Sequence, residues 1–162
     1  AATGSGSIKV DGSASLDART GSGAITATAV AGPTRANSGS GSITITQAGK
    51  GDVEVSAASG VITLAGVDGA ARVNSSSGGI RIDGRPAGAW SLRTSSGGIT
   101  ITVPPDAAFD LDARTNSGSI DSVHPVTMEV TGKIDKRHVQ GKVRGGGPRI
   151  EAFCSSGSIR IK

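Results

Sequence analysis

Residues 90–101 read WSLRTSSGGITI, in which a Ser-Gly corner joins two short segments whose apolar and polar residues alternate. Trp90 and Leu92 precede the corner, and Ile99 and Ile101 follow it. Alternation with a period of two is typical of a strand that buries one face, and glycine supplies the backbone angles that a sharp bend requires. The stretch therefore predicts a strand, a tight corner and a second strand.

The same signature recurs along the whole chain, so the fold is best explained by an internal repeat. The Ser-Gly-x-Ile motif ends at Ile8, Ile25, Ile43, Ile62, Ile80, Ile99, Ile120 and Ile159. These isoleucines are 17, 18, 19, 18, 19, 21 and 39 residues apart, and the last gap indicates one coil without the signature. Each coil is expected to cover its apolar face with the next coil, about 4.8 Å along the axis. The chain is therefore predicted to be all-β, a parallel β-solenoid of about 8–9 coils of 17–21 residues.

The residue six positions before each corner glycine belongs to a column of mostly charged positions. In chain order, the residues that indicate this column are Asp17, Arg35, Glu54, Arg72, Ser91, Asp112 and Glu151. The sign alternates over the first four, which places opposite charges across neighbouring strands if the coils stack in parallel and in register. The corner serines are expected to point at the solenoid axis and to stack with their copies above and below.

An antiparallel β-sandwich is the alternative architecture, because regularly spaced turn signals also fit hairpins. A sandwich gives no reason to repeat one corner motif along the chain, so the solenoid is favoured. Residues 1–162 are expected to form one domain, with an irregular coil that carries a basic hairpin at about 121–149.

Composition and charge limit the possible partners. The 162 residues include 26 glycines, and the aromatic residues are Trp90, Phe109 and Phe153. A net charge of +4 favours an anionic partner, such as an anionic glycan or an envelope surface. Proteins that bind single-stranded nucleic acids stack bases on aromatic side chains, so no nucleic acid is expected. No run approaches the roughly 20 apolar residues of a membrane span, so no transmembrane segment is expected in this chain.

No set of residues points to catalysis or to a cofactor. The repeated serines occupy one equivalent corner, whereas a catalytic serine requires a nearby base and an oriented acid. His124 and His138 are the only histidines, too few for a metal site that normally recruits three or four ligands. Cys154 is the only cysteine, which excludes an internal disulfide. We therefore expect no enzyme activity, no catalytic residues, no metal and no cofactor.

Basic residues concentrate in the coil that lacks the signature, and this cluster is the candidate anion-binding site. Its members are Lys133, Lys136, Arg137, Lys142, Arg144 and Arg149. Basic side chains on an irregular loop over a rigid rod are well placed to meet an anionic partner. A solvated hairpin that is kept soluble by its charge is the alternative interpretation.

Several stretches resemble a bacterial family of β-strand repeat proteins classed as adhesins, a domain of unknown function. The stretches LRTSSGGI (92–99) and LDARTNSGSI (111–120) carry the likeness, and GGGPRI (145–150) followed by CSSGSIRI (154–161) looks like the family's closing coil. The resemblance covers essentially the whole chain. It implies a repeat fold outside the membrane, behind a leader or an anchor helix absent from this chain, and it carries no catalytic residues.

The two ends of the chain suggest a second hypothesis about function. Solenoids usually close their ends with a cap, because the last coil exposes unpaired strand edges. Residues 1–6 and 159–162 both lie within the repeat, and nothing in the sequence resembles a cap. We expect a non-enzymatic, adhesin-like binding scaffold in the cell envelope or the extracellular space. The alternative is a structural protein that self-associates end to end into filaments through uncapped solenoid ends.

Overall fold

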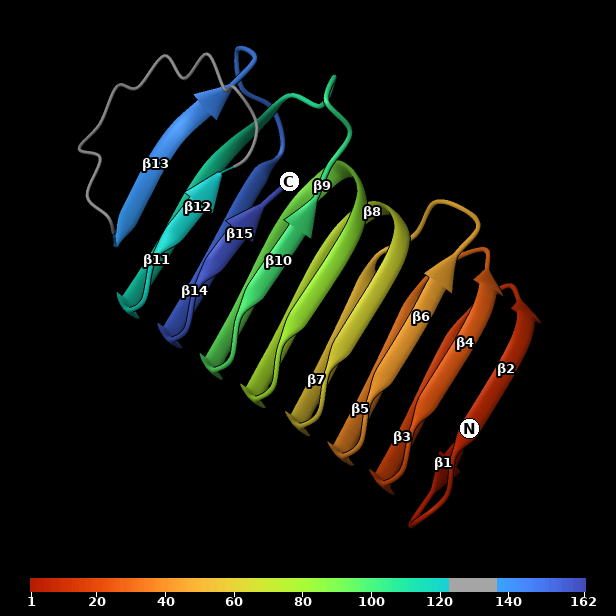
Figure 1. The fold of residues 1–162 in the computed structure, drawn as a ribbon. Helices are drawn as coiled ribbons and strands as arrows, with labels where there is room; N and C mark the ends of the chain where they lie inside the picture. The colour runs from red at the N-terminus through yellow and green to blue at the C-terminus, as the bar shows by residue number, and fades with distance from the viewer. Residues whose placement is uncertain (123–136) are drawn as a thin grey trace.

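The computed structural model describes residues 1–122 and 137–162, and every regular element in them is a β-strand (Figure 1). The strands are β1 (Ala2–Thr3), β2 (Ile8–Ser13), β3 (Leu16–Ser22), β4 (Ile25–Val30), β5 (Thr34–Ser40), β6 (Ile43–Gln47), β7 (Val53–Ser59), β8 (Ile62–Ser77), β9 (Ile80–Ser96), β10 (Ile99–Thr102), β11 (Phe109–Ser117), β12 (Ile120–Ser122), β13 (His138–Val143), β14 (Arg149–Ser156) and β15 (Ile159–Ile161). The all-β prediction is confirmed.

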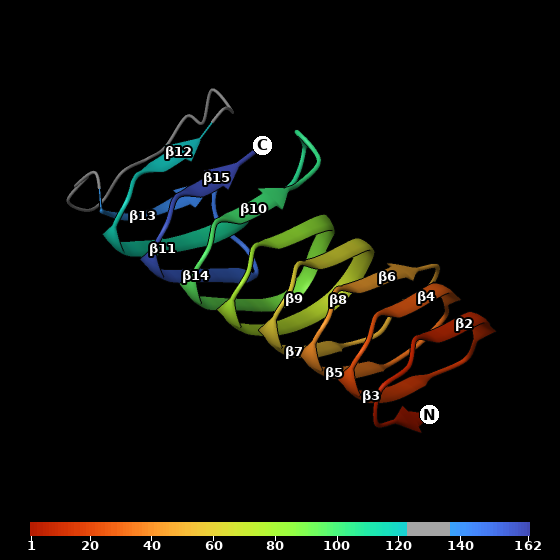
Figure 2. The same cartoon turned by 60° about the horizontal axis from the view of Figure 1, so that its bottom comes forward.

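Two layers of strands face each other and form a parallel β-solenoid, as the repeat predicted (Figure 2). Each coil supplies one strand before its Ser-Gly corner and one strand after it. β8 and β9 are long because they continue from one layer into the other: residues 62–65 of β8 pair with β6, whereas residues 71–77 pair with β7.

The winding follows the order of the sequence for about five turns. The corner isoleucines pair successively, in the order Ile8, Ile25, Ile43, Ile62, Ile80 and Ile99. After β10 the chain leaves this order. The predicted count of about 8–9 coils is therefore wrong, because the repeat period does not reveal where regular winding stops.

The coil that comes last in the sequence does not lie last in the stack. Ile159 of β15 pairs with Ile99 of β10 on one side and with Ile120 of β12 on the other. β14 likewise lies between β9 and β11, and Figure 1 shows these two blue strands between earlier elements. The C-terminal coil is thus inserted in the stack between two coils that come earlier in the sequence. The expectation that residues 159–162 form an exposed end of the solenoid is wrong.

β13 closes one side of the stack in a way that the sequence did not indicate. It runs antiparallel to β11, with Val143 opposite Phe109 and His138 opposite Arg114. The other strand pairs of the described residues are parallel, which contradicts the antiparallel sandwich. The basic hairpin at 121–149 and the single domain stay predictions, because residues 123–136 lie outside the described residues.

The core is a narrow column of apolar side chains between the two layers. The residues two and four positions after the corner glycine point inward, as Ile80 and Ile82 do with 0% and 1% exposure. Trp90 is buried too, and its Nε1 donates a hydrogen bond of 2.9 Å to the carbonyl oxygen of Gly69. The predicted alternation is confirmed, and it leaves every second side chain of a strand on the outer surface.

The glycine of the corner is required by close contact between coils. Gly78 has a φ of 145°, and a Cβ atom added there would lie 2.0 Å from the carbonyl oxygen of Gly60 in the preceding coil. Neither this angle nor this distance is compatible with a larger residue. The glycine of the Ser-Gly signature is therefore required by the close spacing of the coils as well as by the bend.

The corner serines are exposed, so the expectation that they point at the axis is wrong. They do stack in register, as Ser77 and Ser96 show. The inward hydroxyl groups lie two positions before the serine: Thr94 Oγ1 donates to the carbonyl oxygen of Gly78 at 3.2 Å. The equivalent bond is made by Thr20, Ser38, Thr115 and Cys154. This internal ladder ties each of these coils to the corner of a neighbouring coil.

The column of charges has the predicted register. Asp17 pairs with Arg35, Arg35 with Glu54, and Glu54 with Arg72. Of these three pairings, only Arg35 and Glu54 form an ion pair, with Arg35 Nη2 2.7 Å from Glu54 Oε2. Both side chains are about half exposed, so the pair specifies register more than it adds stability.

Candidate functional site

The structure describes four of the six residues of the predicted basic cluster, and it brings two of them, Lys142 and Arg149, to the same hollow. Lys133 and Lys136 lie outside the described residues. Arg137 and Arg144 are exposed in turns, and Lys142 is exposed on β13 opposite Asp110. Whether these residues bind an anion stays a prediction.

Arg149, the last member of that cluster, already has acidic partners. Its Nε lies 3.0 Å from Glu151 Oε1, and its Nη2 lies 3.3 Å from Asp112 Oδ2. Arg149 and Lys142 line one hollow of about 260 Å³, but Asp110 and Asp112 line it as well. This hollow therefore presents mixed charge rather than a basic surface.

Asp112 is the centre of a compact ionic cluster at the β11 side of the stack. Its side chain is only 8% exposed, and Arg114 contacts both of its oxygens at 2.9 and 3.0 Å. Arg149 and His138 Nε2 add contacts of 3.3 and 3.2 Å. Burial alone would raise the pKa of Asp112. The hydrogen bonds and the charge of Arg114 lower it, as do the hydrogen bonds from Arg149 and His138, so the pKa lies below its usual range. The cluster thus joins β11, β13 and β14, and its basic groups are used within the protein.

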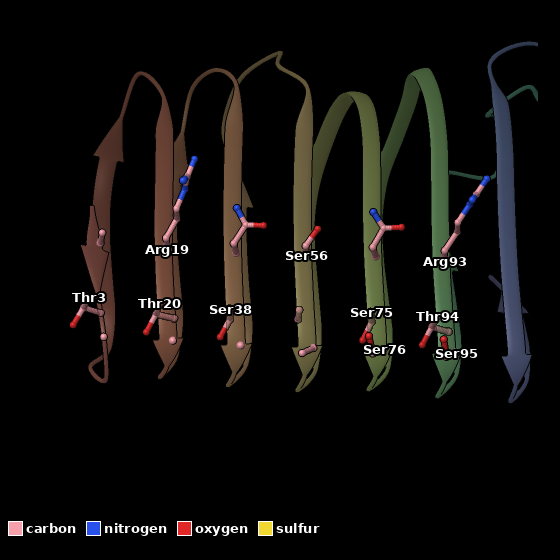
Figure 3. A pocket seen from close by; sticks show the side chains of 18 of the residues that line it. Thr3, Arg19, Thr20, Ser38, Ser56, Ser75, Ser76, Arg93, Thr94 and Ser95 are labelled. Carbon is pink, nitrogen blue, oxygen red and sulfur yellow. The ribbon is translucent and has the colours of Figure 1, made fainter.

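A trough of about 980 Å³ runs across the outer face of the strands that precede the corners (Figure 3). Small residues two positions before six of the corner glycines line it, namely Gly4, Gly21, Gly39, Ala58, Ser76 and Ser95. Larger side chains of the next outward row stand along it. Figure 3 shows Arg19 and Arg93 near opposite ends, with Ser56 between them. The trough exists because one outward row consists of glycine, alanine and serine, whereas the row beside it, from Arg19 to Phe153, carries larger side chains at every position except Ser56.

The row along the trough is chemically suited to a long polar ligand. In stacking order its members are Arg19, Asn37, Ser56, Asn74, Arg93 and Phe153. Amide and hydroxyl groups in the middle can donate and accept hydrogen bonds, and guanidinium groups stand toward both ends. Arg19 and Arg93 are four strand spacings apart, which is about 19 Å. Arg19 is partly neutralised by Asp17 at 3.5 Å, so the Arg93 end carries the freer positive charge.

Phe153 gives this end of the trough an apolar surface. Its side chain points outward, and the residue is 39% exposed. It stands between two arginines, because the register pairs Phe153 with Arg93 on one side and with Arg114 on the other. Arg114 is bonded to Asp112, but Arg93 has no ion pair among the described residues, so Phe153 and Arg93 together offer an apolar contact and a charge to the same ligand.

The sequence prediction missed Arg93, Asn74 and Phe153 as candidate site residues. The period of the repeat placed Arg93 and Asn74 in one outward column, and this signal was available from the sequence. The position of Phe153 beside Arg93 was not available, because it depends on the inserted C-terminal coil.

The fold and the repeated corner define a β-solenoid repeat protein. The whole chain, residues 1–162, matches the model of the Toastrack DUF4097 family, and the chain belongs to this family. The family is a domain of unknown function, so membership accounts for the repeat fold and assigns no activity. No curated protein and no solved structure matched the chain. Within residues 1–122 and 137–162, no helix has the length and apolar character needed to cross a membrane.

Proposed function

We propose that this chain is a non-enzymatic binding scaffold of the bacterial cell envelope or extracellular space, and that its trough holds an extended anionic polysaccharide. The observation that supports this proposal is the trough itself, with arginines toward both ends and amide and hydroxyl groups between them. A ligand with repeating units suits a surface that repeats every coil. The cationic ends favour an acidic polymer.

A polysaccharide fits the trough better than a nucleic acid or a peptide. Hydroxyl-rich sugars can exchange hydrogen bonds with Asn37, Ser56 and Asn74, and the ring of Phe153 can cover the apolar face of a sugar. A nucleic acid would require several stacking platforms, and Phe153 is the only exposed aromatic side chain of the described residues. An acidic peptide such as polyglutamate could also pair with the arginines, but it has no apolar sugar face for the ring of Phe153 to cover.

The test is calorimetric titration with polygalacturonate, with amylose as the neutral polymer and polyglutamate as the acidic peptide. We expect polygalacturonate to bind, amylose to bind at least about tenfold more weakly, and added salt to weaken binding by screening the charges. The polymer should keep its length after long incubation. Failure to bind acidic polysaccharides, shortening of the polymer, or tighter binding of polyglutamate would overturn the proposal.

The location of the site is tested by filling the trough. Ser56→Trp places a bulky side chain at its centre and should abolish binding of polygalacturonate. Thr44→Trp is the matched control, because Thr44 is exposed on β6 in the opposite layer. Equal loss of binding in both variants would show that the ligand does not lie in the trough.

End-to-end self-association is a second candidate function, and unpaired strand edges favour it. Among the described residues, β2 pairs only with β4 and β12 pairs only with β15, and an unpaired edge can accept another strand. Against it, β13 covers the edge of β11. Sedimentation over about a hundredfold range of concentration tests the idea: fibres support it, whereas a monomer at every concentration overturns it.

A further inference from the structure

A second hollow of about 520 Å³ adjoins the trough where the column of charges is interrupted by Ser91. In the stack, this column runs Arg72, Ser91, Glu151 and Asp112. Serine is much shorter than its neighbours, so it leaves a depression between the flanking side chains. Arg72, Asn74, Arg93, Arg149 and Glu151 line the depression.

Two arginines of this hollow have no charged partner among the described residues. The acidic neighbours are already bonded elsewhere, since Glu54 accepts hydrogen bonds from Arg35 at 2.7 and 3.0 Å and Glu151 pairs with Arg149 at 3.0 Å. Across the described ranges, neither Arg72 nor Arg93 forms an ion pair or a side-chain hydrogen bond. The described side chains of the hollow therefore carry a net positive charge.

The backbone register arranges the donors around one point. Arg72 and Asn74 of β8 lie opposite Ser91 and Arg93 of β9. These positions form a four-sided frame in which the two arginines are diagonal, about 8 Å apart at the backbone. Long guanidinium side chains can reach one oxyanion from both corners, and the Asn74 amide and the Ser91 hydroxyl add two further donors.

We propose that Arg72, Asn74, Ser91 and Arg93 form a carboxylate subsite that binds a uronic acid unit of the polysaccharide. This inference rests on the proposed function, because Asn74 and Arg93 line the trough as well as the hollow. A carboxylate that branches from a sugar in the trough enters the frame. The sugar ring then lies near Phe153, which pairs in register with Arg93. A planar carboxylate matches the paired donors of a guanidinium group.

The experiment measures binding of oligogalacturonate to the full chain and to Arg72→Gln and Arg93→Gln. Each variant is expected to bind about tenfold more weakly, because a charge-assisted hydrogen bond is lost. Arg81→Gln is the control, since it removes the same charge from an exposed position in the opposite layer. Arg72 and Arg93 are exposed, so the unfolding curves of Arg72→Gln and Arg93→Gln should match those of the unmodified protein.

Two further ligands separate this subsite from the general attraction of charges. Methyl-esterified oligogalacturonate keeps the sugar chain but loses the charge, and we expect it to bind about tenfold more weakly. Dextran sulfate tests the chemistry of the anion, and we expect it to depend less on Arg93. The uronate assignment would be overturned if the methyl ester bound as tightly as oligogalacturonate. It would also be overturned if dextran sulfate bound as tightly or more tightly and its binding depended fully on Arg93.

The two proposals can fail separately. If Ser56→Trp abolishes binding while Arg72→Gln and Arg93→Gln bind normally, the trough is the site and the carboxylate subsite is wrong. If the unmodified protein binds no acidic polysaccharide, the proposed function and the subsite both fall.

Discussion

The sulfur atom of Cys154 lies 3.0 Å from the carbonyl oxygen of Gly97, inside the solenoid. One coil earlier, the hydroxyl of Thr94 makes the equivalent bond to Gly78. The coil of Cys154 stacks directly on the coil formed by β9 and β10. Its thiol therefore continues the inner ladder, although 60 residues of sequence separate Cys154 from Thr94. Burial raises the pKa of its thiol, which keeps this group neutral as a hydrogen-bond donor.

Replacement of a corner glycine should weaken the stack strongly. Gly78→Ala places a Cβ atom 2.0 Å from the Gly60 carbonyl oxygen at a φ of 145°, so we expect a loss of at least about 2 kcal/mol in the free energy of unfolding. Gly79→Ala is the control, since its Cβ atom would have its nearest neighbour at 3.5 Å. Urea unfolding measures both, and equal losses would contradict the steric explanation.

The inner hydroxyl ladder predicts a difference between two neighbouring coils. Thr94→Val keeps the shape of the side chain but removes its bond to Gly78, which should cost about 1 kcal/mol. Ser75 is equivalent in position, yet its buried oxygen has no hydrogen-bond partner in the described part of the chain. Ser75→Ala should therefore be close to neutral. A larger loss for Ser75→Ala than for Thr94→Val in thermal unfolding would contradict this account.

The Asp112 cluster predicts a specific pH dependence of stability. Asp112→Asn removes the charge that Arg114 and Arg149 contact, so we expect a loss of about 1–2 kcal/mol near neutral pH. The folded-state pKa of Asp112 lies below its unfolded-state value, which is about 3.9. The contribution of Asp112 is thus fully present above that value and is lost as the pH falls through the folded-state pKa.

Denaturant unfolding from about pH 7 to pH 2 measures this difference. The stability of the unmodified protein and that of Asp112→Asn should converge in acid. Asp83→Asn, at an exposed position of β9, should show neither a large loss nor convergence. A gap between the unmodified protein and Asp112→Asn that widens as the pH falls would contradict the assigned direction of the pKa shift.

The inserted C-terminal coil predicts uneven protection of the backbone. A chain that ends at Gly147 lacks β14 and β15, which are the parallel partners of β11 and β12. We expect hydrogen exchange to show lost protection in β11 and β12 and retained protection in β3 to β7, because each coil depends on its neighbours. Retained protection in β11 would mean that its coil can stack directly on β9.

The repeat was sufficient to predict the fold class and most of the local register. The alternation around Ile80 identified the inward residues, and the alternating signs of Asp17, Arg35 and Glu54 predicted parallel pairing. These features depend on contacts between equivalent positions of successive coils, so a single period describes them. The direction of the corner serines was predicted wrongly, because the bend turns them outward and leaves Thr94 and its equivalents inside.

The sequence by itself determined that the chain winds into coils with a Ser-Gly corner, and it determined which face of each strand is buried. Only the tertiary structure decided the order of the last coils. Every coil presents the same in-register edge, so the repeat cannot say which coil stacks on which. The hollow at Ser91 depends on that order: Phe153 and Glu151 stand beside Arg93 and Ser91 because the final coil entered between β9 and β11. Without this insertion, Arg114 would take the place of Phe153 beside Arg93, and Asp112 would take the place of Glu151 beside Ser91. The site would then hold the Arg114–Asp112 ion pair in place of an aromatic ring.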